Sequence, residues 1–181
     1  MTVKKNIPNF ITSLRIIGTV IILFLSPLKT PFFIVYTFSG ATDALDGLVS
    51  RLTHTTSAFG AKLDSIADLI FYSVSLIKLL PALWITLPSY IWIIVGVILF
   101  LRILSYIISA VRFRRFASHH TILNKITGVL VFAVPYFIVT PFATVFCIAV
   151  CVSGFLSTVE DLYIHISSPF YDESVKSVFT M

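Results

Sequence analysis

The chain has 181 residues, of which 57% are hydrophobic and only 12% are charged, and its formal net charge is +5. Its mean hydropathy of +1.00 is too high for a water-soluble globular protein of this length, so that class is excluded. No nucleic-acid-binding motif accompanies the positive charge, and we expect no nucleic-acid partner.

Six apolar segments follow one another along the chain, and most are long enough to cross a bilayer as helices, which takes about 20 residues. Prolines separate several of these segments. A short segment at residues 7–10 is expected to lie on the membrane surface. The fold class is therefore predicted to be all-α, with residues 1–181 forming a single polytopic membrane domain. The predicted spans are residues 11–28, 32–49, 58–80, 88–113, 122–139 and 142–166.

Basic residues gather on one side of the predicted bundle. The connections on the other side carry only Lys29 and Lys78. By the positive-inside rule, both termini are predicted to lie in the cytoplasm and the chain to lie in the cell membrane. The basic residues on the predicted cytoplasmic side are Lys4, Lys5, Arg51, Lys62, Arg112, Arg114, Arg115, Lys125 and Lys176.

Four aspartates, Asp43, Asp46, Asp64 and Asp68, interrupt the second and third spans. A carboxylate at membrane depth costs roughly 2.5–3.5 kcal/mol on insertion scales. The spacing within each pair places both carboxylates on one helix face, and the chain reversal between the spans brings the two faces together. Four carboxylates offer only hard oxygen ligands, which favour Mg²⁺, Mn²⁺ or Ca²⁺. They suffice for two ions about 3.5–4 Å apart, an arrangement used in phosphoryl chemistry.

Two other interpretations account for the aspartates less well. A purely structural interpretation would pair them with Arg51 and Lys62, but two cations are too few for four buried carboxylates. A divalent-cation channel or transporter does not explain Gly47, Gly60 and Arg51 around the cluster. Glycines let a diphosphate approach a helix closely, and an arginine binds phosphate oxygens in a bidentate manner. The same arginine would repel a transported cation.

The spacing of these residues resembles the signature of the CDP-alcohol phosphotransferases, D-x2-D-G-x2-A-R-x8-G-x3-D-x3-D. Here it reads Asp43-x2-Asp46-Gly47-x2-Ser50-Arg51-x8-Gly60-x3-Asp64-x3-Asp68, with Ser50 as the one departure. The resemblance implies six transmembrane helices around a cytoplasm-facing polar cavity, usually in a homodimer. It also implies that an alcohol attacks a CDP-linked donor, usually CDP-diacylglycerol, and that CMP leaves.

The resemblance also implies roles for single residues. Asp68 would act as the general base that takes the proton of the acceptor hydroxyl. The intact set of aspartates argues against a family member that has lost activity and serves only as a scaffold. The implied ligands of two Mg²⁺ or Mn²⁺ ions are Asp43, Asp46, Asp64 and Asp68, and the implied contacts of the CDP group are Gly47, Arg51 and Gly60.

The acceptor alcohol is indicated less directly. Residues 6–15 are similar to the N-terminal segment of phosphatidylglycerophosphate synthases, N-x-P-N-x-[LI]-T-x-x-R, which favours glycerol 3-phosphate. Ser65 and Leu69 depart from those enzymes, which have Pro and Lys there, so serine or inositol phosphate remains an alternative acceptor. The basic residues predicted to bind the acceptor are Arg102, Arg112 and Lys125.

The remaining charged residues are given plainer roles. Arg15, near the start of the first span, is expected to extend to the membrane surface. Arg102 lies well inside the fourth span, where it would bind either a carboxylate or the acceptor phosphate. Glu160 and Asp161 are expected at the membrane interface or paired with a basic loop residue.

Overall fold

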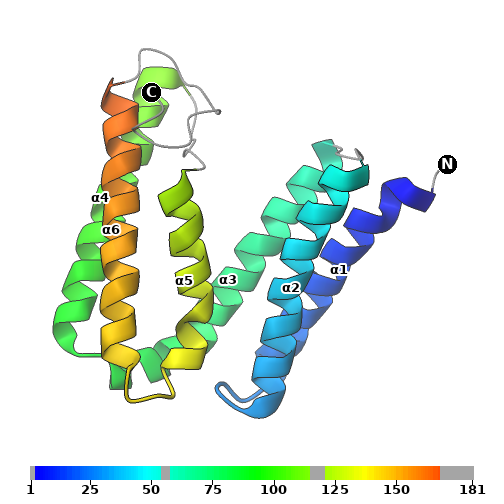
Figure 1. The fold of residues 1–181 in the computed structure, drawn as a ribbon, viewed down its shortest axis with the longest axis horizontal. Helices are drawn as coiled ribbons and strands as arrows, with labels where there is room; N and C mark the ends of the chain where they lie inside the picture. The colour runs from blue at the N-terminus through cyan, green and yellow to red at the C-terminus, as the bar shows by residue number, and fades with distance from the viewer. Residues whose placement is uncertain (1–2, 54–57, 115–120, 168–181) are drawn as a thin grey trace. The chain divides into compact units, whose positions relative to one another are not determined.

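The computed structural model describes the backbone of residues 3–53, 58–114 and 121–167. Within these ranges, the side chains of residues 3–9, 44, 46–53, 58–59 and 61 lie outside the description. The described residues form six α-helices and no strand (Figure 1), which confirms the all-α prediction. The helices are α1 (Val3–Phe24), α2 (Thr30–Thr53), α3 (Ala58–Thr86), α4 (Ser89–Phe113), α5 (Ile122–Phe137) and α6 (Ala143–Ser167).

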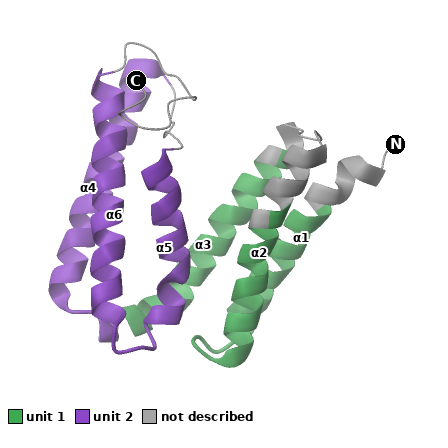
Figure 2. Cartoon of the chain, viewed as in Figure 1, with its two compact units in different colours: residues 1–83 green, residues 84–181 purple. Residues whose placement is uncertain are grey.

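The chain divides into two compact units, residues 1–83 and 84–181 (Figure 2). In the first unit α1 packs along α2, and α3 contributes all but its last residues. In the second unit α4 and α5 both pack against α6. The prediction of a single domain stays a prediction.

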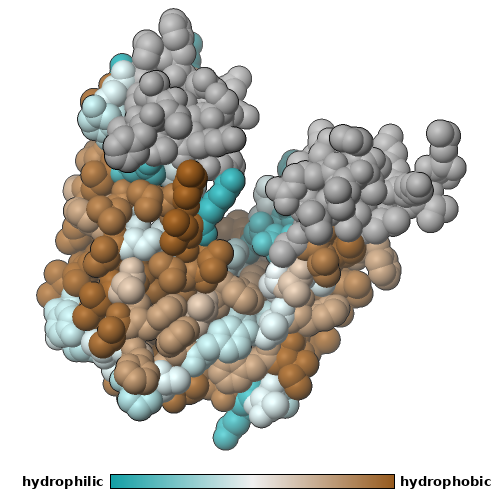
Figure 3. Space-filling view, viewed as in Figure 1, coloured by the Kyte–Doolittle hydropathy of each residue, from teal (hydrophilic) through white to brown (hydrophobic). Residues whose placement is uncertain are grey.

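Several helices have the length and composition of membrane spans. Residues Lys62–Thr86, Ser89–Phe113 and Ala143–Ser167 are each long and apolar enough to cross a bilayer, and Phe10–Phe24 and Ile122–Phe137 are shorter apolar helices. Apolar side chains cover much of the face drawn in Figure 3 in both units. These features fit a polytopic membrane protein, whereas the number of spans stays a prediction.

Two predicted helix boundaries are wrong. Helix α1 begins at Val3, so residues 7–10 continue the helix instead of forming a separate segment, and their place on the membrane surface stays a prediction. Helix α3 runs through Pro81 to Thr86, although a break was expected at that proline. Membrane helices tolerate proline because neighbouring groups satisfy the carbonyl that loses its partner. The helix ends just before Pro88, where the residue preceding a proline disfavours the α conformation.

Close packing of α1 on α2 depends on Gly18. A Cβ atom at this position would meet Oγ of Ser39 well inside contact distance, and Ser39 is fully buried. In the part of α2 that precedes Ser39, Phe32 and Tyr36 stack with Phe71 in a column, with ring centroids 5.6 and 5.2 Å apart, and join α2 to α3. The first unit is therefore held by a close helix contact and an aromatic column.

We expect Gly18→Val to destabilise the chain by about 1–3 kcal/mol, because an overpacked contact forces the two helices apart. Gly96→Val is the matched control, since an added Cβ at Gly96 meets nothing within 4 Å. Thermal unfolding of the purified chains in detergent measures the difference. Equal midpoints for the two variants would show that the α1–α2 contact is not tight.

Polar side chains join α4 to α6 in the second unit. Ser105 of α4 donates a hydrogen bond to Oδ2 of Asp161 at 3.0 Å, and its oxygen lies 2.9 Å from Nδ1 of His165. All three residues are buried, and so is Glu160. Asp161 can face the packed interior because α4 presents a hydroxyl to it, and the predicted place of Glu160 and Asp161 at the membrane interface or beside a basic loop residue stays a prediction.

Candidate metal centre

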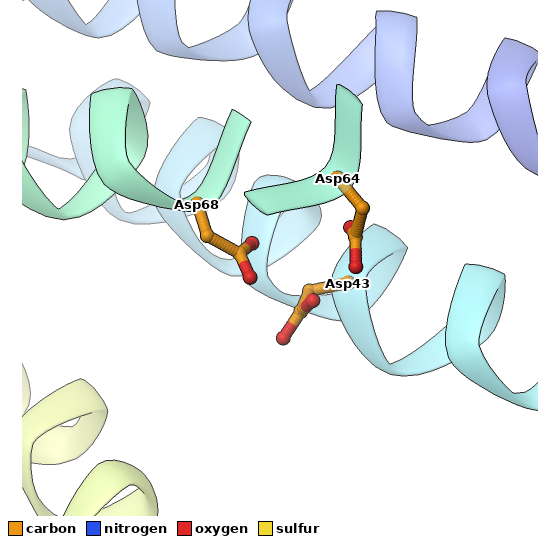
Figure 4. A group of neighbouring side chains, drawn as sticks. All are labelled: Asp43, Asp64 and Asp68. Atoms are coloured by element: carbon orange, nitrogen blue, oxygen red, sulfur yellow. The ribbon is translucent and has the colours of Figure 1, made fainter. Parts of the chain in front are cut away.

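Three of the four predicted aspartates come together in the first unit. Asp43 projects from α2, and Asp64 and Asp68 project from α3, with their carboxylates turned toward one another (Figure 4). One carboxylate oxygen from each lies within 4.8 Å of the other two. The spacing of Asp64 and Asp68 puts them on successive turns of one helix face. The helix pairing therefore gathers three negative charges from residues far apart in the sequence.

A buried arginine on α1 lies against this cluster. Nη1 of Arg15 donates to Oδ1 of Asp64 at 2.9 Å and to Oδ1 of Asp68, and Nη2 lies 3.3 Å from Oδ1 of Asp43. The Arg15 side chain is 0% exposed, whereas the three aspartate side chains are 36–44% exposed. The guanidinium thus meets the carboxylates from the packed side, and part of each carboxylate remains accessible from outside.

The prediction that Arg15 extends to the membrane surface is wrong. Three carboxylates offer the guanidinium a stronger interaction than partial hydration at the membrane surface would. The structural interpretation of the sequence paired the aspartates with Arg51 and Lys62. In the structure Arg15 pairs with three of them, and Lys62 is exposed. The sequence feature that could have indicated the burial of Arg15 is a run of positions at helical spacing on α1, all of which the structure buries. These positions are Thr12, Arg15, Gly18, Thr19 and Ile22.

The other residues of the signature are placed less completely. Helix α2 also contains Asp46, Gly47 and Arg51, but the structure describes only the backbone at these three positions. Gly60 lies in the first turn of α3, one turn before Asp64, and is partly buried. Its place on the helix agrees with the predicted proximity to the aspartates.

The basic residues predicted to bind the acceptor lie in the second unit. Arg102 of α4 donates to Oδ1 of Asn124 at 3.1 Å, and its guanidinium carbon lies 5.8 Å from the centre of the Tyr106 ring. Arg112 donates to the backbone carbonyls of His165 and Ile166 at the end of α6, where a cation offsets the negative end of the helix dipole. Lys125 is exposed in the first turn of α5.

The three aspartates have the properties of a site for a hard divalent cation. Their ligand atoms are all carboxylate oxygens, which Mg²⁺ and Mn²⁺ prefer, and they lie close enough to share one ion. The accessible sides of the carboxylates leave room for a ligand to approach. The arrangement can therefore hold a divalent cation.

Comparisons with known proteins match the part of the chain that contains the three aspartates and extend well beyond it. A family model described as CDP-alcohol phosphatidyltransferase matches residues 5–165, which include parts of both units. Several relatives carry the name CDP-diacylglycerol–glycerol-3-phosphate 3-phosphatidyltransferase. The one from Pseudomonas fluorescens is 40% identical over 46% of this chain and 47% of its own.

Two further relatives with that name match to a similar extent. The protein from Wigglesworthia glossinidia brevipalpis is 36% identical over 53% of this chain and 57% of its own. The protein from Haemophilus influenzae is 36% identical over 50% of this chain and 53% of its own. The chain thus spans about half the length of the curated relatives it matches. No solved structure matches the chain.

Proposed function

The chain belongs to the CDP-alcohol phosphatidyltransferase family, and from this premise we propose that it transfers the phosphatidyl group of CDP-diacylglycerol to glycerol 3-phosphate and releases CMP. The observation that carries the proposal is the convergence of Asp43, Asp64 and Asp68 from two helices. The names of the relatives support the choice of donor and acceptor. The N-terminal segment, residues 6–15, supports the same acceptor.

The aspartates of the signature would hold two divalent cations, Mg²⁺ or Mn²⁺. When bound, such ions neutralise the diphosphate and stabilise the charge that develops on departing CMP. Asp43 contributes from α2, and Asp64 and Asp68 contribute from α3. Asp46 is proposed as the remaining ligand on the signature alone.

The transfer itself is a substitution at the lipid-linked phosphorus. The acceptor oxygen forms a bond to that phosphorus, the bond to the CMP oxygen breaks, and the acceptor proton passes to a base. Asp68 is the proposed base from the family resemblance, and its partly exposed carboxylate would let an acceptor hydroxyl approach. Gly47, Arg51 and Gly60 are proposed to contact the CDP group. Candidates for the acceptor phosphate are Arg102, Arg112 and Lys125, of which Arg112 would have to release the end of α6.

The cellular setting belongs to the same proposal. The proposed location is the plasma membrane, with both termini in the cytoplasm, because basic residues gather at the corresponding connections. The acyl chains of the donor would stay in the bilayer while its polar head reaches the aspartates. A homodimer is proposed from the family resemblance.

CMP release from the purified chain tests the proposed reaction. With CDP-diacylglycerol and Mg²⁺, we expect CMP to appear when glycerol 3-phosphate is added, and neither serine nor inositol phosphate to replace it. A chelator is expected to stop the reaction. CMP release with serine or inositol phosphate would correct the acceptor. No CMP with any acceptor, together with Mn²⁺ flux into liposomes, would favour a cation transporter instead.

A further inference from the structure

Arg15 is a buried charged residue of the first unit that pairs with several acidic side chains. Its guanidinium is fully buried and contacts three carboxylates from two other helices. A buried charge is tolerated only where opposite charges and hydrogen bonds compensate it. The charges of Arg15 and of the three aspartates are therefore coupled to one another.

The carboxylates that pair with Arg15 are the same three that lie close enough to hold a metal ion. Each negative charge that Arg15 partly neutralises is less available to a divalent cation. A positive charge this close also disfavours the arrival of a second one, as neighbouring like charges do in coupled ionisable sites. The geometry therefore makes Arg15 and a divalent cation compete for the same negative charges.

Competition for charge does not require competition for space. Arg15 is 0% exposed, whereas Asp43, Asp64 and Asp68 keep 36–44% of their side-chain surface accessible. The contacts described between Arg15 and the aspartates include the Oδ1 atom of each aspartate. A cation can thus approach from the accessible side while the guanidinium stays on the packed side.

We propose that Arg15 is a positioning residue that acts as a resident counter-cation. It holds the three carboxylates together before a metal ion binds and lowers the affinity of the cluster for that ion. This role rests on the proposed function, because it assumes that the aspartates bind a divalent cation. The expected consequence is that the centre releases its metal more readily than three aspartates without an arginine would.

Mn²⁺ binding to the full chain in detergent tests the proposal, with free Mn²⁺ measured by electron paramagnetic resonance. Arg15→Gln is expected to bind Mn²⁺ about tenfold more tightly or better, the order of effect that one nearby charge has on an ionisable group. Arg15→Lys keeps the charge and is expected to bind as the unaltered chain does. Lys78→Gln is the matched control. It removes a positive charge of α3 whose described contact is the backbone carbonyl of Leu23 on α1.

The outcomes separate the two proposals. Unchanged or weaker Mn²⁺ binding by Arg15→Gln, when the unaltered chain binds Mn²⁺, would overturn the role of Arg15 alone. Absence of Mn²⁺ binding in both would overturn the metal centre and, with it, that role. If Arg15→Gln is unstable without metal, added Mn²⁺ is expected to restore its thermal stability. Instability that Mn²⁺ does not relieve would also count against the proposal.

Discussion

Asp64→Asn is expected to lower CMP release at least about 100-fold while the chain still assembles. The substitution keeps the shape of the side chain but removes one of the three charges that converge in the first unit. It also removes a hydrogen-bonded partner of Arg15. The rate of CMP release at saturating CDP-diacylglycerol and glycerol 3-phosphate measures the effect, and size-exclusion chromatography reports assembly.

Asp161→Asn is the control for this experiment. It likewise replaces an aspartate by its amide, but Asp161 is buried on α6 in the second unit, where Ser105 can still donate to the amide oxygen. We expect this variant to keep most of the transfer activity. Activity of Asp64→Asn equal to that of the unaltered chain would remove Asp64 from the mechanism.

Asp161→Ala is expected to lower the stability of the chain by about 2–3 kcal/mol, because it leaves buried polar groups without their partner. Ser105 would lose its hydrogen bond to Oδ2, and His165 would lose the carboxylate 3.8 Å from its Nδ1 atom. For a chain of this size, the thermal midpoint in detergent should fall by about 5–10 °C. Val152→Ala, at a residue 53% exposed on the same helix, is expected to change it far less.

A double-mutant cycle separates the polar contact from a general loss of packing. Ser105→Ala together with Asp161→Ala should cost less than the sum of the two single substitutions, because both remove the same hydrogen bond. Strict additivity would show that the two side chains do not stabilise each other.

The convergence of the aspartates was predictable because it depends on local periodicity and on one chain reversal. Asp64 and Asp68 are spaced one helical turn apart, and an antiparallel pairing of α2 with α3 that turns their aspartate faces together places them near Asp43. The helices were predictable for a similar reason, since long apolar segments cannot satisfy their backbone groups in lipid unless they are helical. The roles of the individual aspartates stay predictions.

The partners of the buried charges were not predictable in the same way. Arg15 lies 49 residues before Asp64, and nothing in its local sequence shows which helix it faces. On α4 and α6, polar residues recur at helical spacing, including Ser105, Ser109, Asp161 and His165. Such stripes indicate that a polar face is buried, but the partner helix follows only from tertiary packing.

The pairing of Arg15 with residues of two later helices has a consequence for biogenesis. A first helix that entered the bilayer alone would carry a cation without an anion, at a cost of roughly 2.5–3.5 kcal/mol. The opposite charges are supplied only when α2 and α3 have been synthesised. If α1 spans the membrane, stable integration of the N-terminal segment is expected to require α2 and α3, so the leading three helices would insert cooperatively.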